Sequence, residues 1–540
     1  MSRFVWALLK LEPGQSVENL DVQVVSHQPV GDVPEELGAP EDLLDTLEEQ
    51  ALETGRQVAR DTFARSWSQI EQGLVADYVA SAPAGEVWRD GIREVRVVTR
   101  AGVLRLARQL CYDRRQGEHC FPGNAALPPH HGEIFTRGAE QLACLLAPQF
   151  SSGITAQLFG YLVREEKAIS ARHVGDLARE HGQRIRTQAA EAVGKILAAG
   201  PTEPVAPLRL QPWHEPRRDR AWRESLDAVV KQALARGEWR PPQGISVAAW
   251  ERVHEYCRPL ADAAGELDPE DLPPLDELAR LGPKIPAGEV VLSLDDVLVR
   301  AREKKQHHQV MTAHVATAEG WRCITGVGDE CLAAVKAAVI QLRRHGYVKL
   351  TVLADGAKWI RGFYREELEP LWTTQGEPES EEACPSAKKR TSEMVLCWWH
   401  LQHKCQLYVQ RMFRQKEVRE PRWRALKNLL WKGEVAEVLR LLQQWRSVAT
   451  SRAPLEELRD YLNNRLESLP NYRQRYSGLQ YIASSVVEKQ NDLLVARREK
   501  GRSLHWSLDG ADALVALNTL MTNGEWATYW KPPPAVAVTA

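Results

Sequence analysis

The stretch EVVLSLDDVL, residues 289–298, joins an apolar run to two consecutive aspartates, Asp295 and Asp296. A short run rich in valine and leucine predicts a strand that is buried on both faces. Acidic residues that follow such a strand lie where the chain leaves the hydrogen-bonded ladder, and functional groups gather there in α/β sheets. The stretch therefore predicts a buried strand that ends at Asp295, although a solvated turn or helix cap explains the same acid.

The segments after this strand predict a mixed α/β sheet. Apolar runs predict further strands over 308–317, 321–325, 347–354 and 394–399. Helical periodicity covers 329–344, 359–368, 401–470 and 484–530. Three strands in succession predict an antiparallel meander, and the later strands alternate with helices. This order excludes a TIM barrel and a simple Rossmann sheet.

Two further acids stand in comparable positions. Asp355 ends the run LTVLA (350–354), and Gly356 permits a sharp exit from that strand. Glu488 lies in SSVVEKQN (484–491), at the flank of an apolar helical stripe and about 100° from Val487. Each acid alone is better explained without a function, as part of a solvated turn or helix cap for an aspartate and as a solvated helix residue for Glu488. Together, two strand-end aspartates and a helical glutamate supply what a two-metal phosphoryl-transfer site requires.

The chemistry of these acids favours magnesium. Carboxylates are hard oxygen ligands for Mg²⁺, which keeps water and substrate phosphate in its remaining positions. Two such ions activate the attacking oxygen and stabilise the leaving one, so no covalent protein nucleophile is needed. This agrees with the absence of GxSxG and P-loop motifs from the sequence. We expect two Mg²⁺ ions, with Mn²⁺ as a possible substitute.

In these segments the sequence resembles the DDE transposases of bacterial insertion sequences, most closely the Kra-type and mutator-like groups. The matching segments are VLSLDD (291–296), VLADGAKW (352–359), CWWHLQHK (397–404), SVVE (485–488), Arg497-Arg498, Gly501, HWS (505–507) and GADAL (510–514). The sequence departs from the family at Asp296, where glycine is usual, so the first metal ligand is either Asp295 or Asp296. It also departs at Cys397, where similar proteins often have aspartate.

The resemblance implies a fold, a reaction and a set of ligands. The fold is α/β, an RNase H-like mixed sheet with a helical insertion, plus an N-terminal helical DNA-binding region. The reaction is metal-dependent cleavage and strand transfer of DNA at the element ends, by a homo-oligomer bound to double-stranded DNA. The catalytic and metal-binding residues are Asp295, Asp355 and Glu488, and His400 is a supporting residue, or packs beside the preceding tryptophans.

Charge is distributed unevenly along the chain. The 540 residues carry a net charge of −2, but residues 1–90 have 6 basic and 17 acidic side chains, whereas residues 401–505 have 21 and 11. The basic region favours a polyanion as partner. A possible helix-turn-helix lies in the helices between 134 and 197. The predicted DNA-binding residues are Arg172, Arg179, Arg422, Arg424, Lys427, Arg497, Arg498, Lys500, Arg502 and Trp506, although Trp506 is equally suited to a core position.

These observations define the expected organisation. We expect an acidic helical region (1–90), a helical region with the possible helix-turn-helix (91–200), a helical segment with Pro-rich linkers (201–286), the two parts of the core (287–400 and 481–531) around a helical insertion (401–480), and a tail (532–540). The sequence contains no apolar run of the roughly 20 residues that a membrane span needs, so we expect a cytoplasmic, nucleoid-associated protein. The alternatives are a non-catalytic, domesticated DNA-binding protein and an RNase H-like nuclease that lacks strand transfer.

Overall fold

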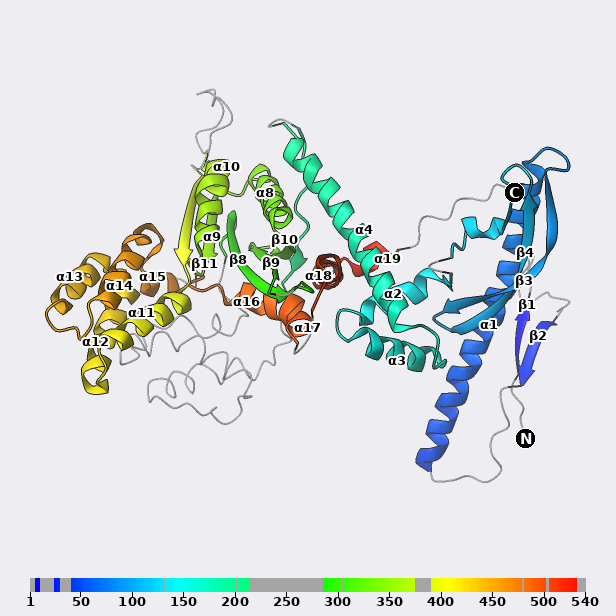
Figure 1. Cartoon of the computed structure of the whole chain (residues 1–540), viewed down its shortest axis with the longest axis horizontal. Coiled ribbons are helices and arrows are strands. Elements are labelled where there is room, and N and C mark those ends of the chain that lie inside the picture. Colours follow the sequence, from blue (N-terminus) through cyan, green and yellow to red (C-terminus); the bar gives the residue numbers. More distant parts are fainter. Residues whose placement is uncertain are drawn as a thin grey trace. The chain divides into compact units, whose positions relative to one another are not determined.

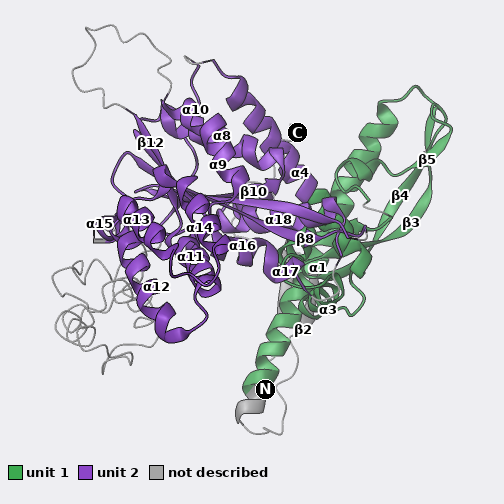
Figure 2. Cartoon of the chain, turned by 60° about the vertical axis from the view of Figure 1, so that its left-hand side comes forward, with its two compact units in different colours: residues 1–181, 532–540 green, residues 182–531 purple. Residues whose placement is uncertain are grey.

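The chain forms two compact units, residues 1–181 with 532–540 and residues 182–531, which are coloured separately in Figure 2. The computed structural model describes residues 5–9, 24–29, 40–129, 132–200, 203–213, 285–303, 305–373, 390–477, 480–501 and 505–531. Most of the segment predicted as helix and linker over 201–286 lies outside these residues, as does the tail. No helix in the described ranges is long and apolar enough to cross a membrane.

The first unit combines a long helix with a four-stranded sheet. Helix α1 (Pro40–Ala80) packs against the antiparallel pair β3 (Val87–Thr99) and β4 (Gly102–Asp113). Partial alternation of apolar and polar residues over 86–104 predicts a short strand pair around Gly102. The structure confirms the pair, but its second strand continues to Asp113, so the first part of the region expected to be helical (91–200) forms a sheet instead. Residues 88–94 of β3 are all exposed, so this part of the strand lacks the alternation of buried and exposed positions that identifies a strand. The unit also contains β1 (Val5–Leu9), β2 (Val24–Pro29), β5 (Glu118–Cys120), β6 (Ile134–Phe135), the 3₁₀ turn Pro122–Ala125, α2 (Arg137–Leu146), α3 (Ser152–Val163) and the start of α4 (Ala171–Ala198).

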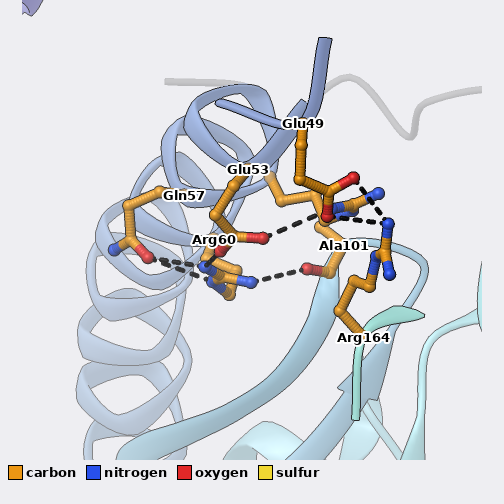
Figure 3. Close-up of polar contacts among 7 residues, drawn as sticks. Glu49, Glu53, Gln57, Arg60, Ala101 and Arg164 are labelled. Carbon is orange, nitrogen blue, oxygen red and sulfur yellow. Dashed lines mark hydrogen bonds and ion pairs between the residues drawn. The ribbon is translucent and has the colours of Figure 1, made fainter. Parts of the chain in front are cut away.

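Arginine side chains fasten α1 to its neighbours. Arg60 donates to the Ala101 carbonyl in the β3–β4 turn at 3.0 Å and to Glu53 on its own helix at 2.6 Å (Figure 3). Further along α1, the fully buried Arg108 of β4 donates from Nε to Glu71 at 3.0 Å. Breaking a buried ion pair leaves an uncompensated charge, so this pair holds the helix in one register on the sheet.

The second unit is built on a six-stranded mixed sheet in the order β12-β11-β8-β9-β10-β7. The central strands β8, β9 and β10 form an antiparallel meander, and β11 and β12 continue the sheet in parallel with β8. This is the arrangement expected of an RNase H-like core. The strands are β7 (Gln211–Pro212), β8 (Glu289–Arg300), β9 (His307–Ala316), β10 (Gly320–Val327), β11 (Lys349–Ala354) and β12 (Thr391–Leu396). The bounds of β9, β10 and β11 lie within two residues of the prediction, β8 and β12 differ from it as described below, and β7 was not predicted.

Helices cover both faces of this sheet (Figure 1). Even-numbered residues of β8, such as Leu292 and Leu294, pack with α8 and the α9–α10 segment in one core cluster. Odd-numbered residues, such as Val291 and Val297, belong to clusters on the other face, which is also the face of Asp295. The covering helices are α8 (Asp329–Arg344), α9 (Lys358–Phe363), the π-turn Tyr364–Leu368, α10 (Glu369–Thr373), α16 (Ser485–Asn491), the π-turn Asp492–Ala496, α17 (Arg497–Glu499), α18 (Leu508–Thr522) and α19 (Trp526–Trp530).

A helical insertion follows β12. Strand β12 runs from Thr391 to Leu396, so the strand predicted over 394–399 is placed three residues too late, because Cys397 precedes a helix that begins at Trp398. Trp398, Trp431 and Tyr472 form one aromatic cluster, with ring centroids 4.8–6.4 Å apart. The insertion consists of α11 (Trp398–Met412), α12 (Lys416–Trp431), α13 (Val435–Trp445), α14 (Ala453–Asn463), the 3₁₀ turn Leu466–Ser468 and α15 (Tyr472–Ser477).

Candidate metal centre

The strand register brings three strand positions to one level of the sheet. Leu353 of β11 pairs with Ser293 of β8, and Ala354 pairs with Leu396 of β12. Two residues beyond Ser293 and Leu353 are Asp295 and Asp355, and the residue after Leu396 is Cys397. Asp295 does not end its strand as predicted, because β8 continues to Arg300 along β9. Asp295 lies two residues beyond the last β8 residue that pairs with β11, so it is at the level where the parallel pairing ends.

The two neighbouring aspartates of β8 point in opposite directions. Asn491 Nδ2 donates to Asp295 Oδ2 at 2.6 Å, whereas Trp359 Nε1 donates to Asp296 Oδ1 at 2.9 Å. The two side chains must point in opposite directions, because successive side chains of a strand lie on opposite faces of the sheet. Asp295 is therefore on the side of α16, and Asp296 is on the side of α9.

A tight turn positions Asp355. The Ala357 backbone N–H donates to Asp355 Oδ1 at 2.7 Å, which fixes the carboxylate at the start of the turn. Gly356 has φ +90°, and a Cβ there would lie 2.9 Å from Leu396 and 3.1 Å from Arg465. Both the backbone conformation and the space at this turn therefore require the glycine.

Helix α16 brings Glu488 to the same face. The helix packs on β8 and β9, and Val487, which is fully buried, anchors it. Ser484, the residue before the helix, donates from Oγ to Glu488 Oε1 at 2.8 Å. Glu488 itself is half-buried, with 43% of its side chain exposed, so it combines a fixed position with access from solvent.

The three acids lie close enough to affect one another electrostatically. Burial raises the pKa of Asp295, and the negative charges of Asp355 and Glu488 raise it further. Hydrogen bonds from Asn491 and the Asp296 backbone lower the same pKa but do not cancel the increase. A divalent cation would relieve both the repulsion and the cost of burial, and oxygen donors of this kind suit Mg²⁺.

Cys397 and His400 border the acids. His400 lies in the first turn of α11, not at a strand end, and its Nδ1 is 3.6 Å from Glu488 Oε1. Interaction with the Cys397 sulfur raises the pKa of His400 to about 9, although burial opposes the increase. Burial raises the pKa of the Cys397 thiol, but His400 and Ser484 outweigh it, so that pKa is lowered overall. His400 is therefore placed beside a carboxylate of the predicted set.

The basic residues predicted to bind DNA differ in exposure. On α4, Arg172 and Arg179 are exposed, but both pair with Asp176, at 3.8 and 2.6 Å. On α12, Arg424 is exposed and Arg422 lies over the Phe413 ring at 4.6 Å. Lys427 is only 5% exposed, so it cannot reach a phosphate without a change of conformation.

The basic residues that follow α16 also differ in exposure. Arg497 and Lys500 are exposed, and Arg502 lies outside the described residues. The Arg498 guanidinium covers the Trp506 ring at 4.8 Å, and Trp506 Nε1 donates to the Glu499 carbonyl at 3.1 Å. The Trp506 backbone also bonds to Arg300 and Arg302 at the end of β8. These contacts favour a packing role for Trp506 over base stacking.

Two residues of the site were not predicted from the sequence. Asn491 holds Asp295, and Ser484 holds Glu488. Both lie three or four residues from Glu488 on the same helical segment, but this spacing does not show which acid each of them contacts.

No family model and no curated protein matches the sequence. Among solved structures, a chain of the Drosophila P element transposase strand transfer complex aligns over 57% of this chain and 86% of its own length, with 10% sequence identity. The TM-score of that alignment is 0.17, and at this value we draw no functional conclusion from the likeness.

Proposed function

We propose that the protein is a DDE-type transposase that binds double-stranded DNA at element ends and catalyses Mg²⁺-dependent strand cleavage and strand transfer. The observation that supports this proposal is that Asp355, in a turn, and Glu488, on a helix, lie near enough to Asp295 on its strand for their charges to act on it. An acid of this kind in isolation is ordinary, but here Asp355 and Glu488 add to the effect of burial in raising the pKa of Asp295, and a divalent cation would relieve both effects.

The donor set fits magnesium. Asp295, Asp355 and Glu488 offer only oxygen, and the Asn491 Oδ1 atom beside Asp295 is buried without a hydrogen-bond partner in the described structure. Bound Mg²⁺ would supply charge neutralisation at the scissile phosphate and at the oxygens that attack and leave it. The protein would contribute positioning: Asn491 orients Asp295, the turn at Gly356 orients Asp355, and Ser484 orients Glu488.

Cleavage of labelled DNA by the purified full-length chain tests this function. The substrate is the DNA that flanks the gene, with Mg²⁺ present. We expect Asp355→Asn and Glu488→Gln each to slow cleavage by about 100-fold or more, because charge stabilisation in the transition state is lost. The matched control is Asp296→Asn, which keeps an oxygen for Trp359 and removes a charge from the opposite face of the sheet.

The same assay separates this proposal from its alternatives. Pre-cleaved ends with a free 3′-OH should be joined to target DNA by the wild-type chain. Cleavage without joining would identify a nuclease. If Asp355→Asn and Glu488→Gln cleaved at the wild-type rate, or if only Asp296→Asn were inactive, the assignment of the acids would be refuted.

A further inference from the structure

A second donor set adjoins the acids. One ligand atom each from Cys397, His400 and Glu488 lie within 4.8 Å of one another. The set differs in chemistry from the three acids, because it combines a sulfur, an imidazole nitrogen and one carboxylate. Such a mixture suits Zn²⁺ and other transition metals, whereas Mg²⁺ prefers oxygen alone.

The surroundings hold these donors in place. The Ser484 backbone N–H donates to Cys397 Sγ at 3.4 Å, and its Oγ donates to Glu488 at 2.8 Å, so one residue orients two of the donors. The Cys397 backbone is fixed by a 2.7 Å bond from its N–H to the Ala354 carbonyl. Partners of this kind orient the ligands of metal sites in proteins.

The third donor has unused bonding capacity. His400 Nδ1 is buried and makes no hydrogen bond within the described part of the chain, and Glu488 Oε1 lies 3.6 Å from it. A buried ring nitrogen without a partner loses free energy unless it binds a proton donor, an acceptor or a metal. A metal ion between His400 and Glu488 would satisfy it.

We propose that Cys397, His400 and Glu488 bind one transition-metal ion, Zn²⁺ by the chemistry of its donors, at a site distinct from the predicted Mg²⁺ site and sharing Glu488 with it. Three protein ligands leave a fourth position of a tetrahedral ion open to water or to a phosphate oxygen. The site thus places a Lewis acid beside the strand ends where Asp295 and Asp355 lie.

Cobalt spectroscopy of the full-length chain tests the site directly. Co²⁺ replaces Zn²⁺ in such sites, and a cobalt–thiolate bond gives a charge-transfer absorption that oxygen ligands do not give. After chelation and dialysis, one equivalent of Co²⁺ should produce this absorption, and Zn²⁺ should abolish it. We expect Cys397→Ser to remove it and His400→Gln to weaken Co²⁺ binding by at least about 100-fold, with Ser484→Ala weakening it by about 10- to 100-fold.

Two controls are matched to these variants. Cys405→Ala removes another buried thiol of α11, and His403→Ala removes an exposed imidazole of the same helix; both should keep the wild-type absorption. Absence of the absorption in the wild-type chain, or its persistence in Cys397→Ser, would overturn the proposal. Asp355→Asn separates the two metal proposals, because it should lose cleavage and keep the cobalt absorption.

Discussion

At the scale of single residues, the candidate metal site consists of acidic side chains and of the polar side chains that hydrogen-bond to them. Asp295, Asp355 and Glu488 stand out in the sequence as candidate ligands because each follows an apolar run or flanks an apolar stripe, and their role as ligands stays a prediction. Asn491 and Ser484 could not be selected in the same way, because a polar residue at the end of a helix is ordinary. Only the packing of α16 on β8 reveals which acids they contact.

Asn491 provides a test at this scale. Asn491→Ala removes the 2.6 Å hydrogen bond to Asp295 and leaves that acid without its side-chain donor. We expect the Mg²⁺ concentration for half-maximal DNA cleavage to rise by about 10- to 100-fold, as is typical when a ligand loses its orienting partner. The neighbouring Asp492→Ala, at an exposed position, is the control. An unchanged Mg²⁺ requirement in Asn491→Ala would exclude Asn491 from the metal site.

At the scale of secondary-structure elements, buried strands were the most predictable part of the chain. The strands β8, β9, β10 and β11 are nearly continuous apolar runs, and the predicted bounds of α8 match those observed. The sheet of the first unit was only partly predicted, because β3 exposes most of its polar first half. The π-turns at 364–368 and 492–496 interrupt the 3.6-residue helical period, and the pattern of apolar residues in the sequence does not indicate them.

The ion pair that joins β12 to α15 gives a prediction for pH. Arg475 Nη1 donates to both Glu393 oxygens, at 2.9 and 3.0 Å. Burial raises the pKa of Glu393, but Arg475 outweighs it, so that pKa lies below its ordinary value of 4.5. A lowered pKa in the folded state stabilises the fold above the unfolded-state pKa, and this stability is lost as the pH falls through the folded-state pKa.

Glu393→Gln should therefore lower the free energy of unfolding by about 1–3 kcal/mol at pH 7. The difference from wild type should shrink as the pH falls below about 4.5, because the wild-type glutamate then becomes neutral as well. Urea denaturation at several pH values measures both effects. Glu367→Gln, which affects an exposed pair with Lys336, should cost less than about 1 kcal/mol. A Glu393→Gln deficit that did not change with pH would contradict the ion-pair interpretation.

At the scale of the whole molecule, the sequence predicts where charge is concentrated but not which basic residues reach solvent. Arg424, Arg497 and Lys500 are exposed, whereas Lys427 is buried and Arg498 covers Trp506. Helical periodicity did not separate these groups, because buried basic side chains occur where aromatic rings or internal partners receive them. Only exposed basic residues can release counterions from DNA.

Salt dependence of DNA binding tests this distinction. Replacing Arg424, Arg497 and Lys500 together with alanine should reduce the slope of log K against log salt concentration by up to about 3, roughly one for each lost phosphate contact. Lys427→Met keeps the buried stem and should leave the slope unchanged. Fluorescence anisotropy at several salt concentrations measures the slope. If the slope were reduced in Lys427→Met but unchanged in the triple variant, DNA would have to bind to a different surface.

The packing of the helical insertion decides how much of it the chain can lose. Its entry and exit adjoin, since the Trp398 N–H donates to the Ile482 carbonyl at 2.9 Å. Nevertheless the insertion does not form a separate domain, because its helices share one apolar core with Val291, Leu353 and Val395 of the sheet. Helices α12 and α13 contribute to the same core, for example through Trp431 and Leu442, so shortening them would uncover part of it. Removing α11 as well would expose apolar sheet surface and make the shortened protein prone to aggregation.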